Sequence, residues 1–292
     1  MGAWGIGLYS NDFGSDVRNA IKVISRLPFD ENQLTEIAVN AFAETAKNRD
    51  DEEYTIFWLV LADQFYRRGI PAKQVFDTAL DIIKSGKDLQ VHQELGMSNA
   101  EIEKRSRVLI ELQTRLKQPI PRKPITVLKK PQPLIMSTGD VIVFPIDIKG
   151  MCINPYYSDK SIERNPDIKF EIAGWGIAVI IACGRVFDFI SYYTPLVVCN
   201  QFSINTKPTL DLAKKTEGWR FAISGTCSKR HFTRMQLETI GKVEIDEKKL
   251  KSHSHRIDNG IFAATNDISI ANRLDFLSQE NHIVKLSHIT AN

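Results

Sequence analysis

The feature that most constrains this sequence is a cluster of prolines near its middle. Five of the twelve prolines lie within residues 119–133, together with four lysines and arginines. Proline removes an amide donor and fixes the backbone angle φ, so this segment cannot be a helix or a central strand. We therefore expect a linker over residues 119–133 that joins two domains, residues 1–118 and 134–292. A proline-rich ligand for another domain is the alternative interpretation.

The residues before the linker have the spacing of amphipathic helices. Apolar residues recur three and four positions apart, as in Phe57, Leu61 and Phe65. Ser98 followed by Glu101 has the pattern of a capping box at a helix start. The first domain is therefore predicted to be an all-α bundle, with helices over residues 13–27, 32–47, 53–68, 72–84 and 99–117.

After the linker the sequence changes to short apolar or alternating segments rich in β-branched and aromatic residues. Strands are predicted over residues 141–148, 175–182, 185–192, 196–201, 219–224 and 240–245. Cys183-Gly184 is the expected hairpin turn between the second and third of these, and a late helix is expected over residues 267–277. The predicted fold class is α+β and multidomain: a helical bundle followed by a curled antiparallel sheet or small barrel.

Charge and hydropathy argue against two classes of partner, nucleic acids and membranes. The net charge of +3 combines 15 basic against 18 acidic residues before residue 119 with 23 against 17 after it. Neither half has the concentrated basic character of a nucleic-acid binder, so we expect no nucleic-acid partner. No apolar stretch approaches the roughly 20 residues of a membrane span, and the N-terminus lacks the pattern of a signal peptide. We expect a cytoplasmic protein with no membrane partner.

No residue pattern predicts catalysis. The four cysteines are too widely spaced for a zinc site, and we interpret them as free thiols in a reducing compartment. Cys227 and His231 could be combined into a nucleophilic pair, but nearness in sequence is no evidence for such a pair. We expect no catalytic residue, no metal site and no cofactor.

The most distinctive motif is at the N-terminus. Trp-Gly-Ile-Gly at residues 4–7 is followed closely by Asn11-Asp12 and by Asp16. Asn11 and Asp12 are good caps for the first helix, and Trp4 is expected to be buried against the helical domain. This opening resembles bacterial domain of unknown function family 4259, over about the first 115 residues. The resemblance implies a small helical cytoplasmic domain, often found near toxin and immunity genes, with no established catalytic residues.

The second half has a resemblance of its own. Thr-Gly-Asp at residues 138–140 opens an apolar strand, Trp175-Gly176 opens another, and Gly218 is followed by a late strand that begins with Trp219. This arrangement is similar to the immunity protein 26 family of polymorphic toxin systems, which implies a β-rich immunity domain. This sequence departs from the family pattern by a long insertion over residues 150–169, which stays unassigned.

The two resemblances and the absence of a catalytic pattern lead to one hypothesis. We expect an immunity protein that binds and neutralises a cognate bacterial toxin of the nuclease, deaminase or ADP-ribosyltransferase class, as a monomer in a one-to-one complex. The alternatives are an enzyme that reverses the toxin's modification and a nucleic-acid-binding regulator that uses the basic linker. Carboxylates that mimic an anionic substrate and aromatic anchors are the expected contacts. The predicted partner-binding residues are Asp50, Asp51, Glu52, Glu53, Tyr156 and Tyr157.

Overall fold

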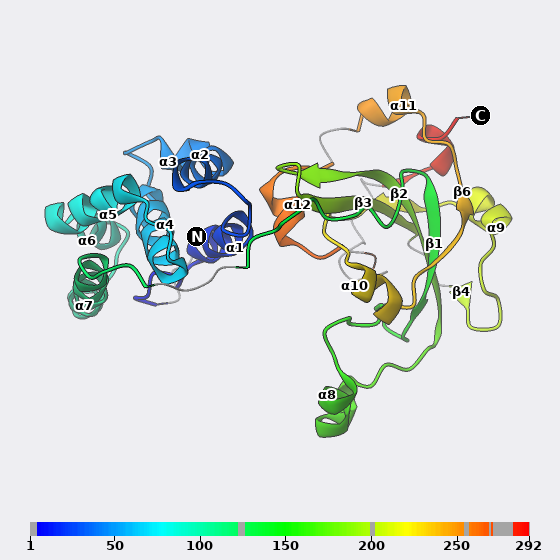
Figure 1. Ribbon diagram of the computed structural model, residues 1–292. Coiled ribbons are helices and arrows are strands. Elements are labelled where there is room, and N and C mark those ends of the chain that lie inside the picture. The colour runs from blue at the N-terminus through cyan, green and yellow to red at the C-terminus, as the bar shows by residue number, and fades with distance from the viewer. Residues whose placement is uncertain are drawn as a thin grey trace. The chain divides into compact units, whose positions relative to one another are not determined.

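The computed structural model describes residues 5–121, 126–198, 202–253, 257–268, 270 and 283–291. It divides the chain into two compact units, residues 1–130 and 131–292, and the division falls inside the proline-rich segment. Each unit is described by itself. The first is helical and the second is built on a β-sheet, so the chain has the predicted α+β fold class (Figure 1).

The first unit has seven helices among its described residues. They are α1 (Asp12–Ile24), α2 (Glu31–Ala41), α3 (Ala43–Ala46), α4 (Tyr54–Arg68), α5 (Lys73–Ser85), α6 (Lys87–Glu94) and α7 (Asn99–Leu116). Four of the five predicted helices are present with ends shifted by a few residues. The predicted helix over residues 32–47 is wrong in its extent, because the chain breaks at Phe42 into α2 and α3. The sequence pattern does not predict α6.

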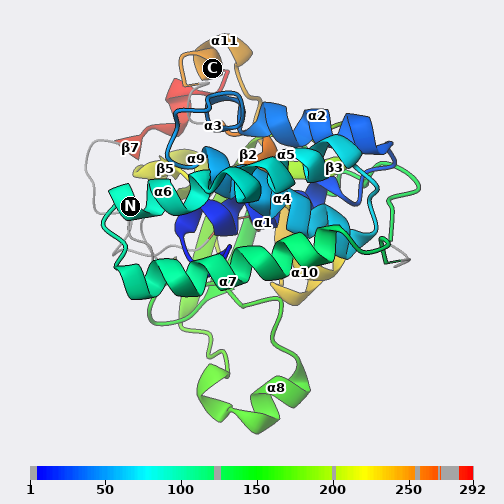
Figure 2. The ribbon, with the colours of Figure 1, turned by 90° about the vertical axis from the view of Figure 1, so that its left-hand side faces the viewer.

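The central helix of this unit is α4. Every residue from Tyr54 to Phe65 is buried, so this helix is enclosed on all sides. It contacts α1, α5 and α7, and Figure 2 shows α7 running in front of it. The bundle therefore buries apolar surface on every side of one central helix, which stabilises it.

The helix ends follow the sequence signals. The Asn11 side chain caps α1 by accepting a hydrogen bond of 2.7 Å from the amide of Gly14. Ser98 and Glu101 form the predicted capping box at the start of α7. Gly69, with φ of 73°, ends α4 in the left-handed region that glycine tolerates best.

The second unit is an open antiparallel sheet. Its strands are β1 (Asp140–Ile146), β2 (Gly174–Val186), β3 (Ile190–Val198), β4 (Phe202–Ser203), β5 (Trp219–Phe221), β6 (Glu238–Lys242) and β7 (Ile283–Val284). The spatial order is β6-β1-β2-β3-β5-β7, and β4 pairs with β2. Within the described residues the edge strands β6 and β7 do not pair with each other, so the sheet does not close into a barrel.

Both faces of this sheet are buried. Ile142 and Phe144 of β1 belong to one apolar core, while Val141 and Val143 belong to another. Successive residues of a strand point to opposite faces, so this alternation places one core on each side. Short helices lie beside the sheet. Helix α9 (Leu210–Lys215) contributes to the core that contains Val141, and α10 (Lys229–Arg234) packs against the core that contains Ile142. Two more follow, α11 (Glu247–Lys251) and α12 (Ile261–Thr265).

The predicted hairpin turn at Cys183-Gly184 is wrong. Both residues lie inside the long strand β2, and Gly184 pairs with Tyr192 of β3. A Cβ atom on Gly184 would lie only 2.9 Å from the Tyr192 ring, so the glycine here makes room for a cross-strand aromatic side chain. The turn follows Val186, where Phe187 and Asp188 have φ of 52° and 62°. The predicted strands 185–192 and 196–201 therefore have wrong boundaries.

Two further segments differ from expectation. The unassigned insertion contains helix α8 (Asp159–Arg164) and a short 3-10 helix (Pro166–Ile168). The late helix predicted from residue 267 does not begin there, because Asp267 forms a bridge with Thr226. Residues 271–277 of that prediction lie outside the described residues.

Candidate functional site

Two buried ion-pair networks attach the segment before α1 to the helical unit. In the first, the guanidinium of Arg105 donates to both carboxylate oxygens of Asp88, at 2.6 and 2.8 Å. Thr55 Oγ1 donates a further hydrogen bond of 3.1 Å to this carboxylate. Arg105 Nη1 donates to the backbone carbonyls of Ile6 and Gly7, at 3.2 and 3.4 Å. One buried guanidinium therefore links α6 and α7 to the N-terminal segment.

The second network surrounds Asp63 of α4, which is fully buried. The Tyr9 hydroxyl donates to this carboxylate and accepts a hydrogen bond of 2.6 Å from Gln64 Nε2. Arg67 and Arg115 lie 2.6 and 2.9 Å from the same carboxylate. Burial and the neighbouring Asp63 raise the pKa of Tyr9, so its hydroxyl stays protonated and donates.

The opening motif is therefore an anchored structural element. Its tyrosine and its backbone carbonyls are bound by the two networks, and Asn11 caps the helix that follows. Gly14 is tightly enclosed, since a Cβ atom there would lie 2.7 Å from the Leu8 carbonyl oxygen. Trp4, which was expected to be buried, lies outside the described residues.

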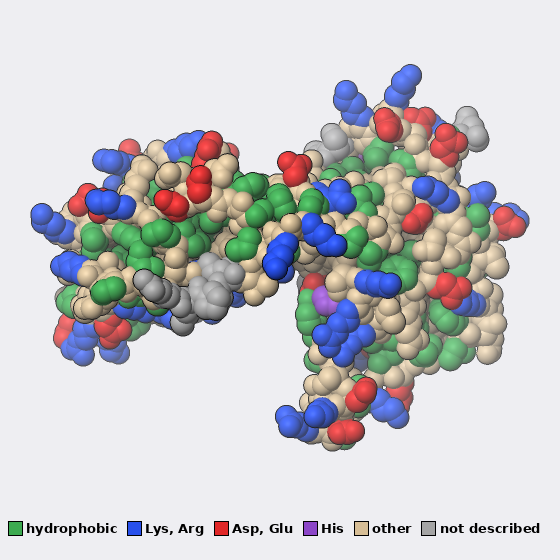
Figure 3. Space-filling view, viewed as in Figure 1, with side chains coloured by type: hydrophobic (Ala, Val, Ile, Leu, Met, Phe, Trp, Pro, Cys, Tyr) green, Lys and Arg blue, Asp and Glu red, His purple; other side chains and the backbone are tan. Residues whose placement is uncertain are grey.

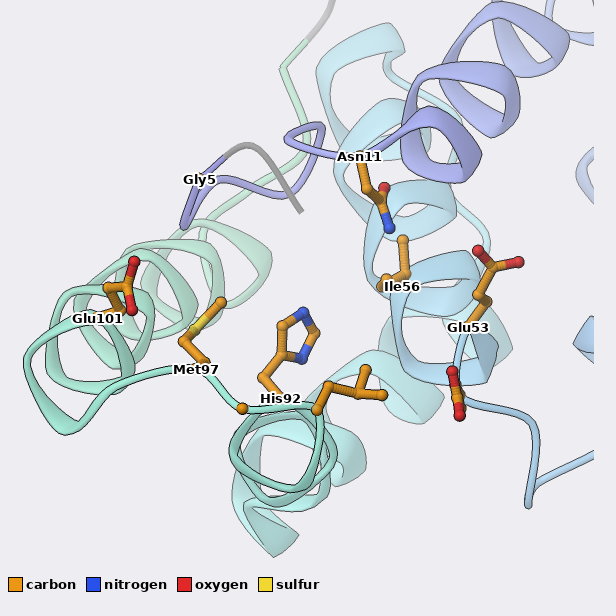
Figure 4. Close-up of a pocket in the computed structure, with 10 residues that line it drawn as sticks. Gly5, Asn11, Glu53, Ile56, His92, Met97 and Glu101 are labelled. Carbon is orange, nitrogen blue, oxygen red and sulfur yellow. The ribbon is translucent and has the colours of Figure 1, made fainter. Parts of the chain in front are cut away.

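An acidic pocket of about 430 Å³ lies beside this segment (Figure 4). Glu52, Glu53, Glu101 and His92 supply its ionisable side chains, and no lysine or arginine is among the described residues that line it. The N-terminal segment, the start of α4, the end of α6 and the start of α7 form its walls. The remaining lining residues are Gly5, Asn11, Ile56, Leu95, Gly96 and Met97.

His92 gives the acidic pocket a hydrogen-bond acceptor. Figure 4 shows its ring between Met97 and Ile56. Its Nδ1 atom lies 2.8 Å from the backbone carbonyl of Asp88, and a carbonyl can only accept, so Nδ1 carries the hydrogen. Burial and the charge of Arg105 lower the pKa of His92 below its usual value of 6.5. The ring is therefore neutral at pH 7, with the lone pair on Nε2.

The carboxylates of the acidic pocket differ in their surroundings. Burial and the nearby charge of Asp51 raise the pKa of Glu53. Hydrogen bonds from Ser98 lower the pKa of Glu101, which is engaged in the capping box. A cationic group placed between Glu52 and Glu53 would relieve the repulsion among these acids. The acidic pocket is thus suited to a positively charged ligand group.

The four predicted acidic residues have two roles. Glu52 and Glu53 line the acidic pocket. Asp50 and Asp51 lie on the preceding turn, where Asp51 Oδ1 accepts a hydrogen bond of 2.8 Å from the Glu53 amide. Asp51 therefore orders the start of α4, and of the four residues Glu52 and Glu53 line the acidic pocket.

The two predicted tyrosines lie in the other unit, on the connection between β1 and β2. This connection, residues 147–173, is called the β1–β2 arm. It carries α8 and extends away from the sheet (Figure 1), and α8 bears charged side chains of both signs (Figure 3). Tyr156 and Tyr157 are 58% and 44% exposed, and Ile148 and Ile172 are also exposed. Of the twelve exposed large hydrophobic side chains among the described residues, four lie on this arm.

Tyr156 is held in place although it is exposed. Its hydroxyl donates to the Asp267 carboxylate at 2.6 Å, and its ring meets the His231 ring edge-on with centroids 4.9 Å apart. Arg234 Nη1 donates to the backbone carbonyl of Pro155 at 2.9 Å. These contacts fix the base of the β1–β2 arm on α10 and its neighbours.

The described residues give no support to a nucleophilic pair of Cys227 and His231. Cys227 is buried, and burial with the nearby charge of Asp267 raises the pKa of its thiol to about 12. A thiol of this kind stays protonated at neutral pH and is a poor nucleophile. Cys152 and Cys183 are free thiols as well, and Cys199 lies outside the described residues.

Three further observations bear on function. In the described part of the chain, no three His, Cys, Asp or Glu side chains gather closely enough to hold a metal ion. None of the helices in these ranges is both long and apolar enough to cross a membrane. No protein-family model, curated protein or solved structure matches the sequence significantly.

Sequence reasoning missed His92 and both ion-pair networks. His92 lies on α6, whose eight residues are mostly polar and give no clear helical periodicity. The spacing of Asp88 and His92 could have indicated a shared polar site, because residues four positions apart lie on one face of a helix. Arg105 and the N-terminal segment are almost a hundred residues apart, and only the fold brings them together.

Proposed function

We propose that this protein is a cytoplasmic immunity protein that neutralises a bacterial toxin acting inside the cell. It would bind the cognate toxic domain, of the nuclease, deaminase or ADP-ribosyltransferase class, and cover its active site or substrate-docking surface. The acidic pocket carries this proposal because it supplies the chemistry of contact. The class of partner rests on the resemblance of the sequence to family 4259 and to immunity protein 26.

The acidic pocket matches a lysine or arginine side chain of a partner. The N–H donors of such a side chain would meet the carboxylates of Glu52 and Glu53 and the Nε2 acceptor of His92. Toxins that act on nucleotides or nucleic acids bind anionic substrates in positively charged clefts. A protein that presents carboxylates to such a cleft competes with the substrate.

The β1–β2 arm supports a second contact. Tyrosine is enriched among the residues that dominate binding energies at interfaces. Because Asp267 and His231 already hold the Tyr156 ring, little side-chain freedom is lost when a partner covers it. Tyr157 extends the same exposed surface.

The linker allows both contacts to serve one partner. Two modest binding surfaces on joined units gain affinity because binding of the first raises the effective concentration of the second. The proposal is therefore a monomer that binds one toxin through both units, with no cofactor.

Titration of the toxin's activity tests this proposal. The probe is the toxic domain encoded beside the gene of this protein, mixed with increasing amounts of the full chain. Inhibition should be complete at one chain per toxin. Full protection at far less than one chain per toxin would contradict occlusion and indicate an enzyme that reverses the toxin's modification.

Variants of the β1–β2 arm test the second contact. Replacing Tyr156 and Tyr157 together by alanine should mainly speed dissociation of the complex. The matched control replaces Ile204 and Ile223, exposed side chains outside the arm, by alanine. Equal dissociation rates for the two double variants would exclude the arm from the interface.

A further inference from the structure

A second hollow of the helical unit is lined by positive charge. It has a volume of about 320 Å³ and lies where α1 meets the end of α4. Arg18 and Lys22 of α1 and Arg67 and Arg68 of α4 line it. Tyr9 and Gln64 complete the lining, and no residue is shared with the acidic pocket.

Three of these four cations have no counter-charge among the described residues. Arg67 pairs with Asp63, at 2.6 Å. Within the described ranges, no carboxylate lies within 4.0 Å of the charged nitrogens of Arg18, Lys22 or Arg68. Burial lowers the pKa of Lys22, and the charges of Arg18 and Arg68 lower it further. The hollow therefore has an uncompensated positive potential.

Arg68, which lines the hollow, has one buried donor without an acceptor among the described residues. Arg68 Nε is buried and has no hydrogen-bond partner among the described residues, while Nη2 of the same side chain donates to Gln64 Oε1 at 3.4 Å. A buried donor without an acceptor is unfavourable, and native structures seldom retain one without a reason. Because this Nε atom is itself closed to solvent, an anion in the hollow would meet the outer nitrogens of the Arg68 guanidinium instead.

On the α1 side of the hollow, the Arg18 side chain is already held in position. The Arg18 guanidinium carbon lies 4.8 Å from the centroid of the Tyr9 ring, as in a cation–π contact. Tyr9 is itself fixed by its hydrogen bonds to Asp63 and Gln64. Arg18 is therefore held above a rigid aromatic ring, and a bound anion would find this cation already in position.

We propose that this hollow binds the terminal phosphate of a small molecule, such as a nucleoside monophosphate. Three uncompensated cations favour a terminal phosphate, with up to two charges, over a phosphodiester with one. Arginine is suited to phosphate because its donors form a planar fork. A volume of about 320 Å³ lies at the small end of the range for ligand pockets, which favours a small ligand over a polymer. The proposal is independent of toxin binding.

Calorimetric titration of the full chain with adenosine monophosphate tests the site. Adenosine is the uncharged control, inorganic phosphate tests whether free phosphate is sufficient, and the dinucleoside monophosphate ApA carries only a phosphodiester. Adenosine monophosphate or inorganic phosphate should bind, and adenosine and ApA should bind at least about tenfold more weakly. Affinity should fall as the pH decreases below about 6, where the phosphate loses its second charge.

Three variants connect binding to the named residues. Arg68→Gln should weaken binding at least about tenfold, since it removes one of the three uncompensated positive charges. Arg18→Gln combined with Lys22→Gln changes two exposed side chains, so folding should be retained while affinity falls similarly. Lys84→Gln is the matched control on α5 and should leave affinity unchanged.

Three outcomes would overturn the proposal. The first is absence of binding of both adenosine monophosphate and inorganic phosphate at millimolar concentration. The second is binding that both the Arg68 variant and the Arg18 and Lys22 double variant leave unchanged. The third is tighter binding of ApA or of a longer oligonucleotide than of adenosine monophosphate, which would assign the hollow to nucleic acid.

Discussion

Replacing Arg105 by methionine should destabilise the helical unit by about 4–6 kcal/mol. The Asp88 carboxylate is fully buried, and among the described residues it would keep the hydrogen bond from Thr55 and a contact of 3.8 Å with His92 Nδ1. Removing one member of a buried ion pair costs about 3–5 kcal/mol, because the other charge is left without a partner. Loss of the bonds to the carbonyls of Ile6 and Gly7 adds about 1 kcal/mol. A loss of this size approaches the whole stability of a typical domain.

A double variant separates the cost of leaving the Asp88 charge unpaired from the cost of losing the hydrogen bonds to the N-terminal segment. Asp88→Leu combined with Arg105→Met removes both charges and replaces them with apolar groups, which is often nearly neutral for a buried pair. The double variant should therefore be only about 1–2 kcal/mol less stable than the parent, mainly because the N-terminal segment loses its donor.

Two measurements are needed. The first is urea unfolding of the full chain, and the second is hydrogen exchange of peptides from α4 and α7. Exchange in these peptides reports the helical unit separately from the sheet unit. A loss below about 1 kcal/mol for Arg105→Met would refute the role of this ion pair. A double variant as unstable as the sum of the two single variants would also refute it.

Three further predictions concern the helical unit and the linker. Tyr9→Phe removes the hydroxyl between Asp63 and Gln64 and should lower the free energy of unfolding by about 1–3 kcal/mol; an unchanged urea midpoint would contradict it. Because the pKa of His92 is lower in the folded state than the unfolded value of 6.5, its contribution to stability is complete above pH 6.5 and is lost as the pH falls below it. His92→Gln should therefore flatten the profile of urea midpoint against pH between about pH 7 and 5, and a profile parallel to that of the parent would refute this. Trypsin should cut first after the exposed Lys129 and leave two folded fragments, whereas earlier cleavage within either unit would contradict the expected linker.

The helices were the most predictable part of the fold. Helical periodicity and caps depend on neighbouring residues, so Asn11 and Ser98 could be assigned as caps from the sequence. The sequence pattern does not predict the mostly polar α6, because the position of this helix depends on packing and on the ion pair between Asp88 and Arg105.

The sheet was less predictable because its residues pair over long distances. Gly184 has the local signature of a turn, but its role is set by the Tyr192 ring on the paired strand. The real turn uses Phe187 and Asp188 with positive φ, a conformation for which phenylalanine gives no sequence signal.

The candidate site was predictable only in part. The acidic composition of residues 50–53 and the exposed character of Tyr156 and Tyr157 can be read locally. The acidic pocket also needs His92 and Glu101, which come from other helices and join it only through the fold. No rule based on sequence spacing connects them.

The rate of association with the toxic domain tests the central claim most directly. Glu52→Lys combined with Glu53→Lys reverses two charges that line the acidic pocket, while Glu36→Lys combined with Glu111→Lys makes the same change on exposed carboxylates elsewhere in the helical unit. If the acidic pocket receives a basic side chain of the toxin, the first double variant should associate much more slowly than the second at low salt, and the difference should shrink as salt is added. Equal association rates for the two double variants, with equal protection of cells, would contradict the account.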